Sequence, residues 1–137
     1  MIYVLDTDVL SNLLKRIPSK PLIAKLAQAP VTQQCTTSIT VGEVIYGASR
    51  AMARTNTLLA QIEGVLLPNL PILPFDRAAA RQYGALRAEL ERQGAPLAEA
   101  DLRIAAITLA NGCTLVTGNE RHFQRIVDLP IENWLVE

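Results

Sequence analysis

Residues 1–14 read MIYVLDTDVLSNLL, and this stretch decides the fold. An apolar run over residues 2–5 is typical of a short buried strand, and two acids, Asp6 and Asp8, follow it. The apolar spacing of residues 9–15 then predicts a helix. A buried strand that passes directly into a helix is the repeating unit of α/β proteins, and the rest of the chain repeats it.

The alternation of strands and helices continues to the end of the chain. Asp76 is placed to cap one helix, which Gly94 would stop, and Asn111-Gly112 would close another. The predicted strands are short and have no polar alternation, as expected when helices cover both faces of a parallel sheet. The predicted fold class is therefore α/β. We expect further strands at 34–38, 70–75, 113–117 and 131–136, and further helices at 22–29, 39–50, 55–67, 76–93, 99–110 and 120–126.

Length and composition suit one compact domain, because the chain has 137 residues and 50% of them are hydrophobic. We expect a single domain over residues 1–137. No apolar run of 18 residues occurs, and no basic segment precedes the N-terminal apolar run, so we expect neither a membrane span nor a secretory signal. Cys35 and Cys113 match no zinc or redox spacing, which predicts buried free thiols in a cytoplasmic protein.

The formal charge is zero overall but is unevenly distributed. Residues 9–62 contain six basic residues and one acid, Glu43, whereas residues 63–137 contain seven basic and ten acidic residues. A basic region of this kind can bind a polyanion, but the charge alone favours an ordinary solvated surface. The single histidine, His122, excludes a metal site built from several histidines.

Acidic and amide side chains occur near the ends of the predicted strands, where parallel sheets bind their ligands. Asp6 ends the first strand, and Asn119 and Glu120 follow a later one. Glu43 and Asp101 lie on helices whose placement is compatible with the same edge. Oxygen ligands without histidine or cysteine suit a hard cation such as Mg²⁺ or Mn²⁺, which can activate water and stabilise charge on a phosphoryl oxygen.

Each acid also has a purely structural explanation. Asp6 can cap the helix that follows it, and Asp8 can be a first-turn acid stabilised by the helix dipole. The dipole also explains Glu99 and Asp101 at the start of their helix. For each residue alone the structural explanation is at least as good, and only the combination of acids favours a metal site.

Four segments occur in a characteristic order: LDTDVLSNLL (5–14), SITVGEVIYG (38–47), ADLRIAAITLANGCTLVTGN (100–119) and IENW (131–134). Any one of them is a weak signal, but together they are specific and cover nearly the whole chain. On these segments the chain resembles the PIN-domain endoribonucleases, in particular the VapC-like and FitB-like toxins of bacterial type II toxin–antitoxin pairs. The resemblance implies a PIN-like three-layer sandwich, with a central parallel sheet of four to five strands and helices on both faces.

The resemblance also implies a set of site residues. It makes Asp6, Glu43 and Asp101 the metal ligands. Asn119 completes the catalytic set at a fourth position, where many relatives carry Asp and others Asn. Some relatives have an acid just before the following Phe, where this chain has His122, so the usual acid is missing from both places.

Further residues are expected to support these ligands. Thr7 and Thr117 would do so through hydroxyl hydrogen bonds, and Asp8 as a neighbouring acid or a helix cap, at a position where relatives usually have Asn or Ser. Glu120, or a water molecule, would replace the missing fourth acid. The supporting set is Thr7, Asp8, Glu99, Thr117 and Glu120.

The implied activity is Mg²⁺-dependent cleavage of RNA phosphodiester bonds, with Mn²⁺ as an alternative cofactor and tRNA or rRNA as the substrate class. The implied partners are a second copy of the chain, as a homodimer, and a cognate antitoxin protein that covers the acidic site. No membrane partner is expected.

Two other interpretations stay open from the sequence. Phosphatases of the haloacid-dehalogenase type also end their first strand in Asp-x-Asp, with an attacking aspartate. The DTDVL segment meets that pattern only in part, because Leu10 stands where Thr or Val is expected and no lysine follows Lys25. The second alternative is a PIN-fold module that binds or processes RNA without acting as a toxin.

Overall fold

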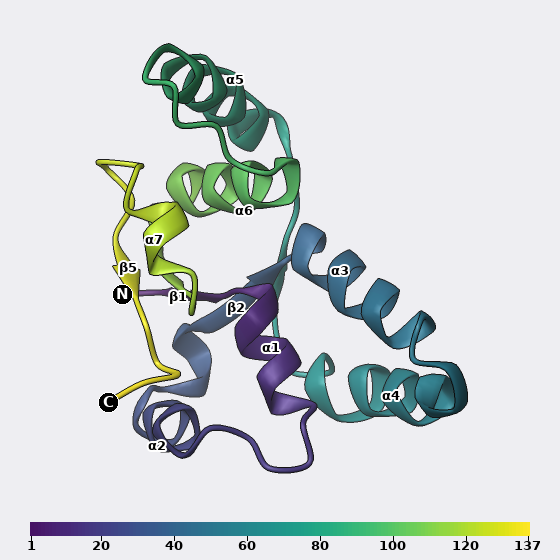
Figure 1. Cartoon of the computed structure of the whole chain (residues 1–137). Coiled ribbons are helices and arrows are strands. Elements are labelled where there is room, and N and C mark those ends of the chain that lie inside the picture. Colours follow the sequence, from purple (N-terminus) through teal and green to yellow (C-terminus); the bar gives the residue numbers. More distant parts are fainter.

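The computed structural model describes all of residues 1–137, and its centre is one five-stranded parallel sheet (Figure 1). The strand order is β3-β2-β1-β4-β5, so the first strand of the chain lies in the middle. The predicted α/β class with a parallel sheet of four to five strands is thereby confirmed. The strands are β1 (Tyr3–Leu5), β2 (Gln34–Thr37), β3 (Ile72–Leu73), β4 (Thr114–Val116) and β5 (Ile131–Glu132).

Helices connect successive strands, as the sequence predicts, and short 3₁₀ turns occupy Val31–Gln33 and Met52–Arg54. Asp76 caps α5 by accepting a hydrogen bond from the Ala79 amide at 3.0 Å. None of the helices has the length and apolar character needed to cross a membrane. The helices are α1 (Thr7–Leu13), α2 (Lys20–Gln28), α3 (Ser38–Ser49), α4 (Thr55–Gln61), α5 (Arg77–Arg92), α6 (Glu99–Ala110) and α7 (Glu120–Phe123).

The predicted helix over 55–67 differs from the observed structure. α4 ends at Gln61, and a π-helical turn, Ile62–Leu66, continues it. The amide of Leu67 donates to the carbonyl of Ile62 at 3.0 Å, which is the wider spacing of a π-helix. Ile62 is fully buried while Val65 on the same turn is 81% exposed, so the turn packs against the core through Ile62. Apolar spacing alone does not distinguish such a turn from the end of an α-helix.

Two hydrophobic clusters, one on each face of the sheet, make the structure a three-layer sandwich. Val4 of β1 and Leu115 of β4 belong to the cluster beneath α5, α6 and α7. Their neighbours Leu5 and Val116 belong to the cluster beneath α1 to α4, because successive strand residues face opposite ways. Figure 1 shows the helices divided between the two sides. Cys35 and Cys113 are buried free thiols, as predicted.

The parallel register aligns the ends of β1 and β4. Leu5 is paired with Val116, and the amide of Asp6 donates to the carbonyl of Val116 at 3.0 Å. The residues that follow the two strands, Asp6 and Thr117, are therefore neighbours at the carboxyl edge of the sheet. This edge is where parallel α/β folds bind their ligands.

Candidate active site

Asp6 lies at the centre of the carboxyl edge and is 2% exposed. It is the N-cap residue of α1, and its Oδ1 accepts a hydrogen bond from the Thr7 amide at 2.7 Å. Its Oδ2 accepts one from the Thr117 hydroxyl, also at 2.7 Å. Burial raises the pKa of Asp6 to about 7, with a further rise from the charges of Asp8 and Asp101, and the two hydrogen bonds oppose this.

Asp8 stands beside Asp6 in the first turn of α1. Its Oδ2 accepts a hydrogen bond from the amide of Gly118 at 2.7 Å, whereas its Oδ1 is buried without a hydrogen-bond partner. Burial is the main cause that raises the pKa of the Asp8 carboxyl. The interpretation of Asp8 as a helix cap is wrong, because Asp6 is the residue that caps α1.

Gly118 is required by this contact, and the sequence analysis did not single it out. A Cβ atom at this position would lie 2.6 Å from Oδ2 of Asp8 and 2.7 Å from Cδ1 of Leu135. Any larger residue would push the Asp8 carboxylate away from the β4–α7 connection. The available signal was the glycine directly after the strand at 113–117, in the segment Thr117-Gly118-Asn119.

Glu43 reaches the same edge from α3, and Thr7 connects it to Asp6. The Thr7 hydroxyl donates to Oε1 of Glu43 at 2.5 Å, while the Thr7 amide donates to Asp6. One residue thus holds two carboxylates that are far apart in the sequence. The hydroxyl hydrogen bonds expected of Thr7 and Thr117 are both present, although their role around a metal ion stays a prediction.

Asp101 lies in the first turn of α6 and faces His122 of α7. Its Oδ2 is 3.6 Å from Nδ1 of His122, whose side chain is half exposed. Burial raises the pKa of Asp101, the neighbouring His122 lowers it, and the charges of Glu43 and Asp8 raise it again. Four carboxyl groups, on α1, α3 and α6, therefore interact electrostatically. The contact between His122 and Asp101 was not predicted from the sequence.

The remaining predicted residues lie differently. Asn119 is exposed, and only its backbone joins the site, since its amide donates to the Thr117 hydroxyl at 3.0 Å. Glu120 accepts a hydrogen bond from Asn133 at 3.2 Å. Glu99 belongs to a separate network between α5 and α6, where it accepts a hydrogen bond from Tyr83 at 2.6 Å. The structure therefore gives no support for the expected role of Glu99 beside the metal ligands.

The donor set suits a hard cation, because it consists of carboxylate oxygens that repel one another and includes one buried oxygen without a partner. In the present arrangement no three Asp, Glu, His or Cys side chains already converge as a complete metal centre. A bound cation would therefore have to draw these side chains together. What the geometry supplies is a group of neighbouring acids, three of which, Asp6, Asp8 and Glu43, already accept hydrogen bonds.

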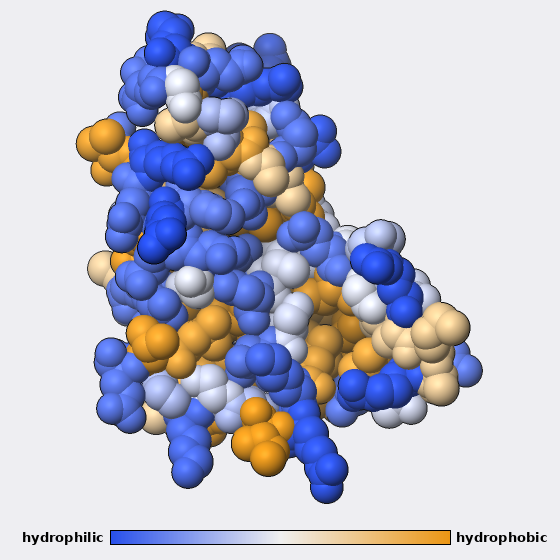
Figure 2. All heavy atoms as spheres, in the orientation of Figure 1, coloured by the Kyte–Doolittle hydropathy of each residue, from blue (hydrophilic) through white to orange (hydrophobic).

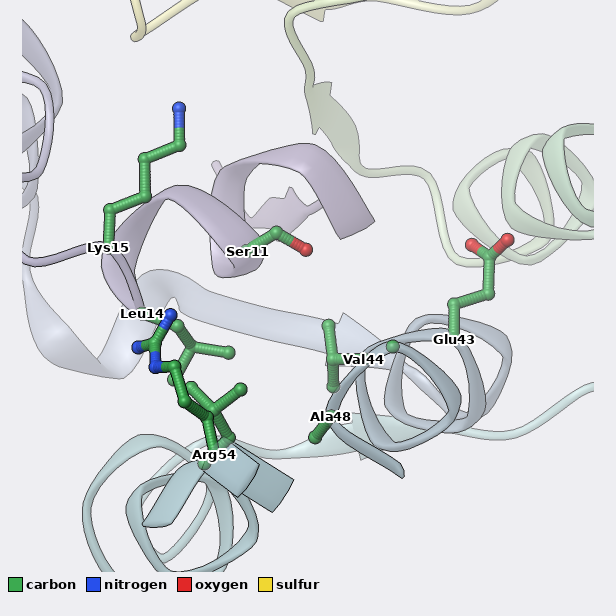
Figure 3. Close-up of a pocket in the computed structure, with 9 residues that line it drawn as sticks. Ser11, Leu14, Lys15, Glu43, Val44, Ala48 and Arg54 are labelled. Carbon is green, nitrogen blue, oxygen red and sulfur yellow. The ribbon is translucent and has the colours of Figure 1, made fainter. Parts of the chain in front are cut away.

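A cavity of about 220 Å³ lies between α1, α3 and α4, and Glu43 is the one acid of the site that lines it. Figure 3 shows Glu43 at one side of it, with Lys15 and Arg54 toward the other. Neither Lys15 nor Arg54 forms an ion pair. Figure 2 shows a hollow with apolar atoms beside α3 and α4. The apolar part of the lining is Leu14, Val44, Ala48 and Leu58.

Comparison with known proteins agrees with this fold. The family model described as PIN domain matches residues 3–129. Ribonuclease VapC2 of Haemophilus influenzae is 35% identical over 133 residues, which cover 97% of this chain and 98% of that protein. The tRNA(fMet)-specific endonuclease VapC of Salmonella typhimurium is 36% identical over 132 residues, covering 96% of this chain and 97% of that protein.

A solved structure shows the same architecture. The DNA-bound VapBC complex from Salmonella typhimurium contains a chain that is 34% identical and superposes with a TM-score of 0.89, with 98% of each chain covered. The likeness extends over the whole sheet and both helical layers, because almost no part of either chain is left out. On the family match and on these relatives, the chain belongs to the PIN-domain family.

Proposed function

We propose that this chain is a metal-dependent endoribonuclease that cleaves RNA phosphodiester bonds, with tRNA or rRNA as substrate, and that it acts as the toxin of a toxin–antitoxin pair. The observation that carries the proposal is the group of acids at the carboxyl edge of a PIN fold. Burial raises the pKa values of Asp6, Asp8 and Asp101, and the charges of neighbouring carboxylates raise those of Asp6 and Asp101 further. Of the two relatives described above, one is named a ribonuclease and the other a tRNA(fMet)-specific endonuclease.

Asp6, Glu43 and Asp101 would hold Mg²⁺ or Mn²⁺, which when bound supplies an activated water and neutralises charge on the phosphoryl oxygens. Asp6 is fixed by donors on both carboxylate oxygens, so its orientation is set before any substrate arrives. Thr7 orients Glu43, and His122 orients Asp101. Asn119 stays a predicted member of the catalytic set but is not among the predicted metal ligands, and Glu120 is its neighbour in the chain.

The cavity beside Glu43 suits a segment of an antitoxin protein. Its apolar lining offers burial for apolar side chains, and the unpaired Lys15 and Arg54 would attract a segment with acidic residues. A segment seated there would lie against Glu43 and so obstruct the acidic edge. The homodimer, the cytoplasmic location and the single domain over 1–137 stay predictions.

The two alternatives from the sequence can now be compared with the structure. The phosphatase interpretation is disfavoured because the family match over residues 3–129 is to PIN domains. An RNA-processing role that is not toxic differs from the proposal only in its biological effect. Expression of the chain with and without the product of a neighbouring small gene separates the two.

The test is RNA cleavage by the purified protein with Mg²⁺ or Mn²⁺. Total RNA is incubated with the wild type, with Asp6→Asn, and with Asp128→Asn, an exposed acid outside the site that serves as the charge control. We expect discrete new RNA 5′ ends with the wild type and with Asp128→Asn, and none with Asp6→Asn or in EDTA. Equal cleavage by wild type and Asp6→Asn would contradict the proposal.

The partner is tested separately by size-exclusion chromatography with the candidate antitoxin. Arg54→Glu reverses a charge at the rim of the cavity, and Arg81→Glu makes the same change on the exposed surface of α5. We expect Arg54→Glu alone to weaken the complex. An unchanged complex would place the antitoxin elsewhere.

A further inference from the structure

The starting observation is an unoccupied hydrogen-bonding position among the acids. Both oxygens of Asp6 accept hydrogen bonds from Thr7 and Thr117. One oxygen of Glu43 accepts from the Thr7 hydroxyl, and one oxygen of Asp101 faces His122. Oδ1 of Asp8 is the only buried side-chain oxygen or nitrogen in the chain without any partner. Burying such an atom without a hydrogen-bond partner costs free energy of folding, unless a ligand or ion binds to it.

The Asp8 carboxylate is also held in place. The amide of Gly118 binds its Oδ2 at 2.7 Å, and the absence of a Cβ at Gly118 allows this close approach. The Asp6 carboxylate accepts from the hydroxyl of Thr117, the residue before Gly118, so both carboxylates lie against the same end of β4. Two adjacent carboxylates, one of them with a free oxygen, form a pair that a divalent cation can bridge.

Asn119, by contrast, is poorly placed to act as an additional ligand. Asn119 is exposed, and its side chain makes no hydrogen bond that would orient it toward Asp6. Glu120 is turned to Asn133. Among the side chains near the ends of β1 and β4, Asp8 is therefore the one whose free oxygen is both buried and fixed.

We propose that Asp8 is a direct ligand of the divalent cation and supplies the fourth acid of the site, in place of Asn119. The inference rests on the proposed function for the identity of the cation, Mg²⁺ or Mn²⁺. It assigns Gly118 a positioning role, because the glycine amide fixes one Asp8 oxygen and leaves the other for the metal.

The experiment measures Mn²⁺ binding by calorimetry and melting temperature with and without Mn²⁺, on protein without RNA. Asp8→Asn keeps the shape of the side chain and an oxygen for the Gly118 amide, and Asp8→Ser provides a second variant without a carboxylate. Asn119→Ala tests the competing position. Asp128→Asn removes an exposed negative charge outside the site.

We expect Asp8→Asn and Asp8→Ser to weaken Mn²⁺ binding at least about tenfold, which is the lower bound for losing even an indirect partner of a metal site. Asn119→Ala and Asp128→Asn should change the affinity less than about twofold. Without metal, Asp8→Asn should melt at a higher temperature than the wild type, because its amide can donate to Asp6 where a like charge stood. A merely structural role for Asp8 would instead lower that melting temperature.

Two results would overturn the inference. If the wild type binds Mn²⁺ and both Asp8 variants bind it within about twofold of the wild type, Asp8 is not a ligand, while the proposed nuclease function stands. If Asn119→Ala weakens binding as much as Asp8→Asn, Asn119 shares the role assigned here to Asp8. Absence of Mn²⁺ binding by the wild type would contradict the metal-dependent function itself, together with this inference.

Discussion

Two regions of the molecule contain several carboxylates, and their electrostatics are opposite. At the carboxyl edge of the sheet, burial raises the pKa values of Asp6, Asp8 and Asp101. On the exposed face of α5, hydrogen bonds from Arg92 lower the pKa of Glu89. The same chemical group is therefore disfavoured as an anion in one region and favoured in the other.

The difference lies in what accompanies the acids. On α5 and α6, Arg87 approaches Glu91 at 3.8 Å and Glu99 at 3.2 Å, and each partner is about half exposed. At the edge of the sheet the only basic side chain in an ion pair is His122. The carboxylates on the helical face are neutralised by arginines of this chain. Those at the edge of the sheet have too few such partners, so a bound cation would stabilise them. A cluster of acids indicates a metal site only when the protein supplies too few cations of its own.

The comparison predicts its largest effect for Asp6→Asn and Asp101→Asn. Each should reduce RNA cleavage by about 10²–10³-fold or more, the range observed when one stabilising group is removed from an active site. Both variants should stay folded by circular dichroism, because removing a repelled charge does not cost stability at this edge. Cleavage at the wild-type rate by both variants would show that the edge is not the reaction centre.

The second prediction concerns pH in the absence of metal. Asp6 has a pKa of about 7 in the folded protein against 3.8 as its ordinary value, so between about pH 4 and pH 7 the folded state binds more protons than the unfolded state. Stability contributed by this group is therefore lost as the pH rises through that window. In EDTA, the melting temperature of Asp6→Asn relative to that of the wild type should rise as the pH increases. A constant difference across the window would contradict the raised pKa.

Gly118→Ala should have an intermediate effect. The added Cβ would meet Oδ2 of Asp8 at 2.6 Å, so the carboxylate must move and lose its hydrogen bond to the backbone. We expect a loss of about 1–3 kcal/mol in unfolding free energy, typical of overpacking, and weaker Mn²⁺ binding. Gly84→Ala, at a helical glycine with open space around it, is the matched control and should not destabilise the protein.

The smallest effect is expected on the helical face. Glu99→Gln removes the partner of Arg87 and Arg103, but these pairs are exposed to solvent. Exposed pairs contribute about 0–1 kcal/mol, so denaturant unfolding should change within that range and RNA cleavage should not change. A large loss of cleavage would mean that Glu99 supports the metal ligands after all, and that the two regions are coupled.

The fold is predictable from sequence where its signals are local. Asp76 and Gly94 bound α5 as predicted, with Asp76 as the N-cap and Gly94 at a φ of 67° just past the helix. Gly112 closes α6 in the same way, at a φ of 62°. The π-helical turn after Gln61 was not predictable, because it depends on how deeply Ile62 is buried against other helices.

The site is predictable only in part, for the same reason. The positions of Asp6 and Asp101 at the ends of their elements point to one edge of a parallel sheet. The contact between Asp8 and Gly118 spans 110 residues of sequence and depends on the register of β1 with β4. No local pattern carries that information, and so the sequence left Asp8 as either a neighbouring acid or a helix cap.

The central place of β1 has a consequence for the timing of synthesis. β1 lies between β2 and β4, and its neighbour Asp6 receives a hydrogen bond from Thr117, which follows 111 residues later in the sequence. Asp101 is also synthesised long after Asp6. A growing chain therefore holds Asp6 long before it holds the residues that orient it. The acidic edge can be assembled only after β4 has been synthesised, so a nascent chain that ends before Thr117 lacks the hydroxyl that orients Asp6.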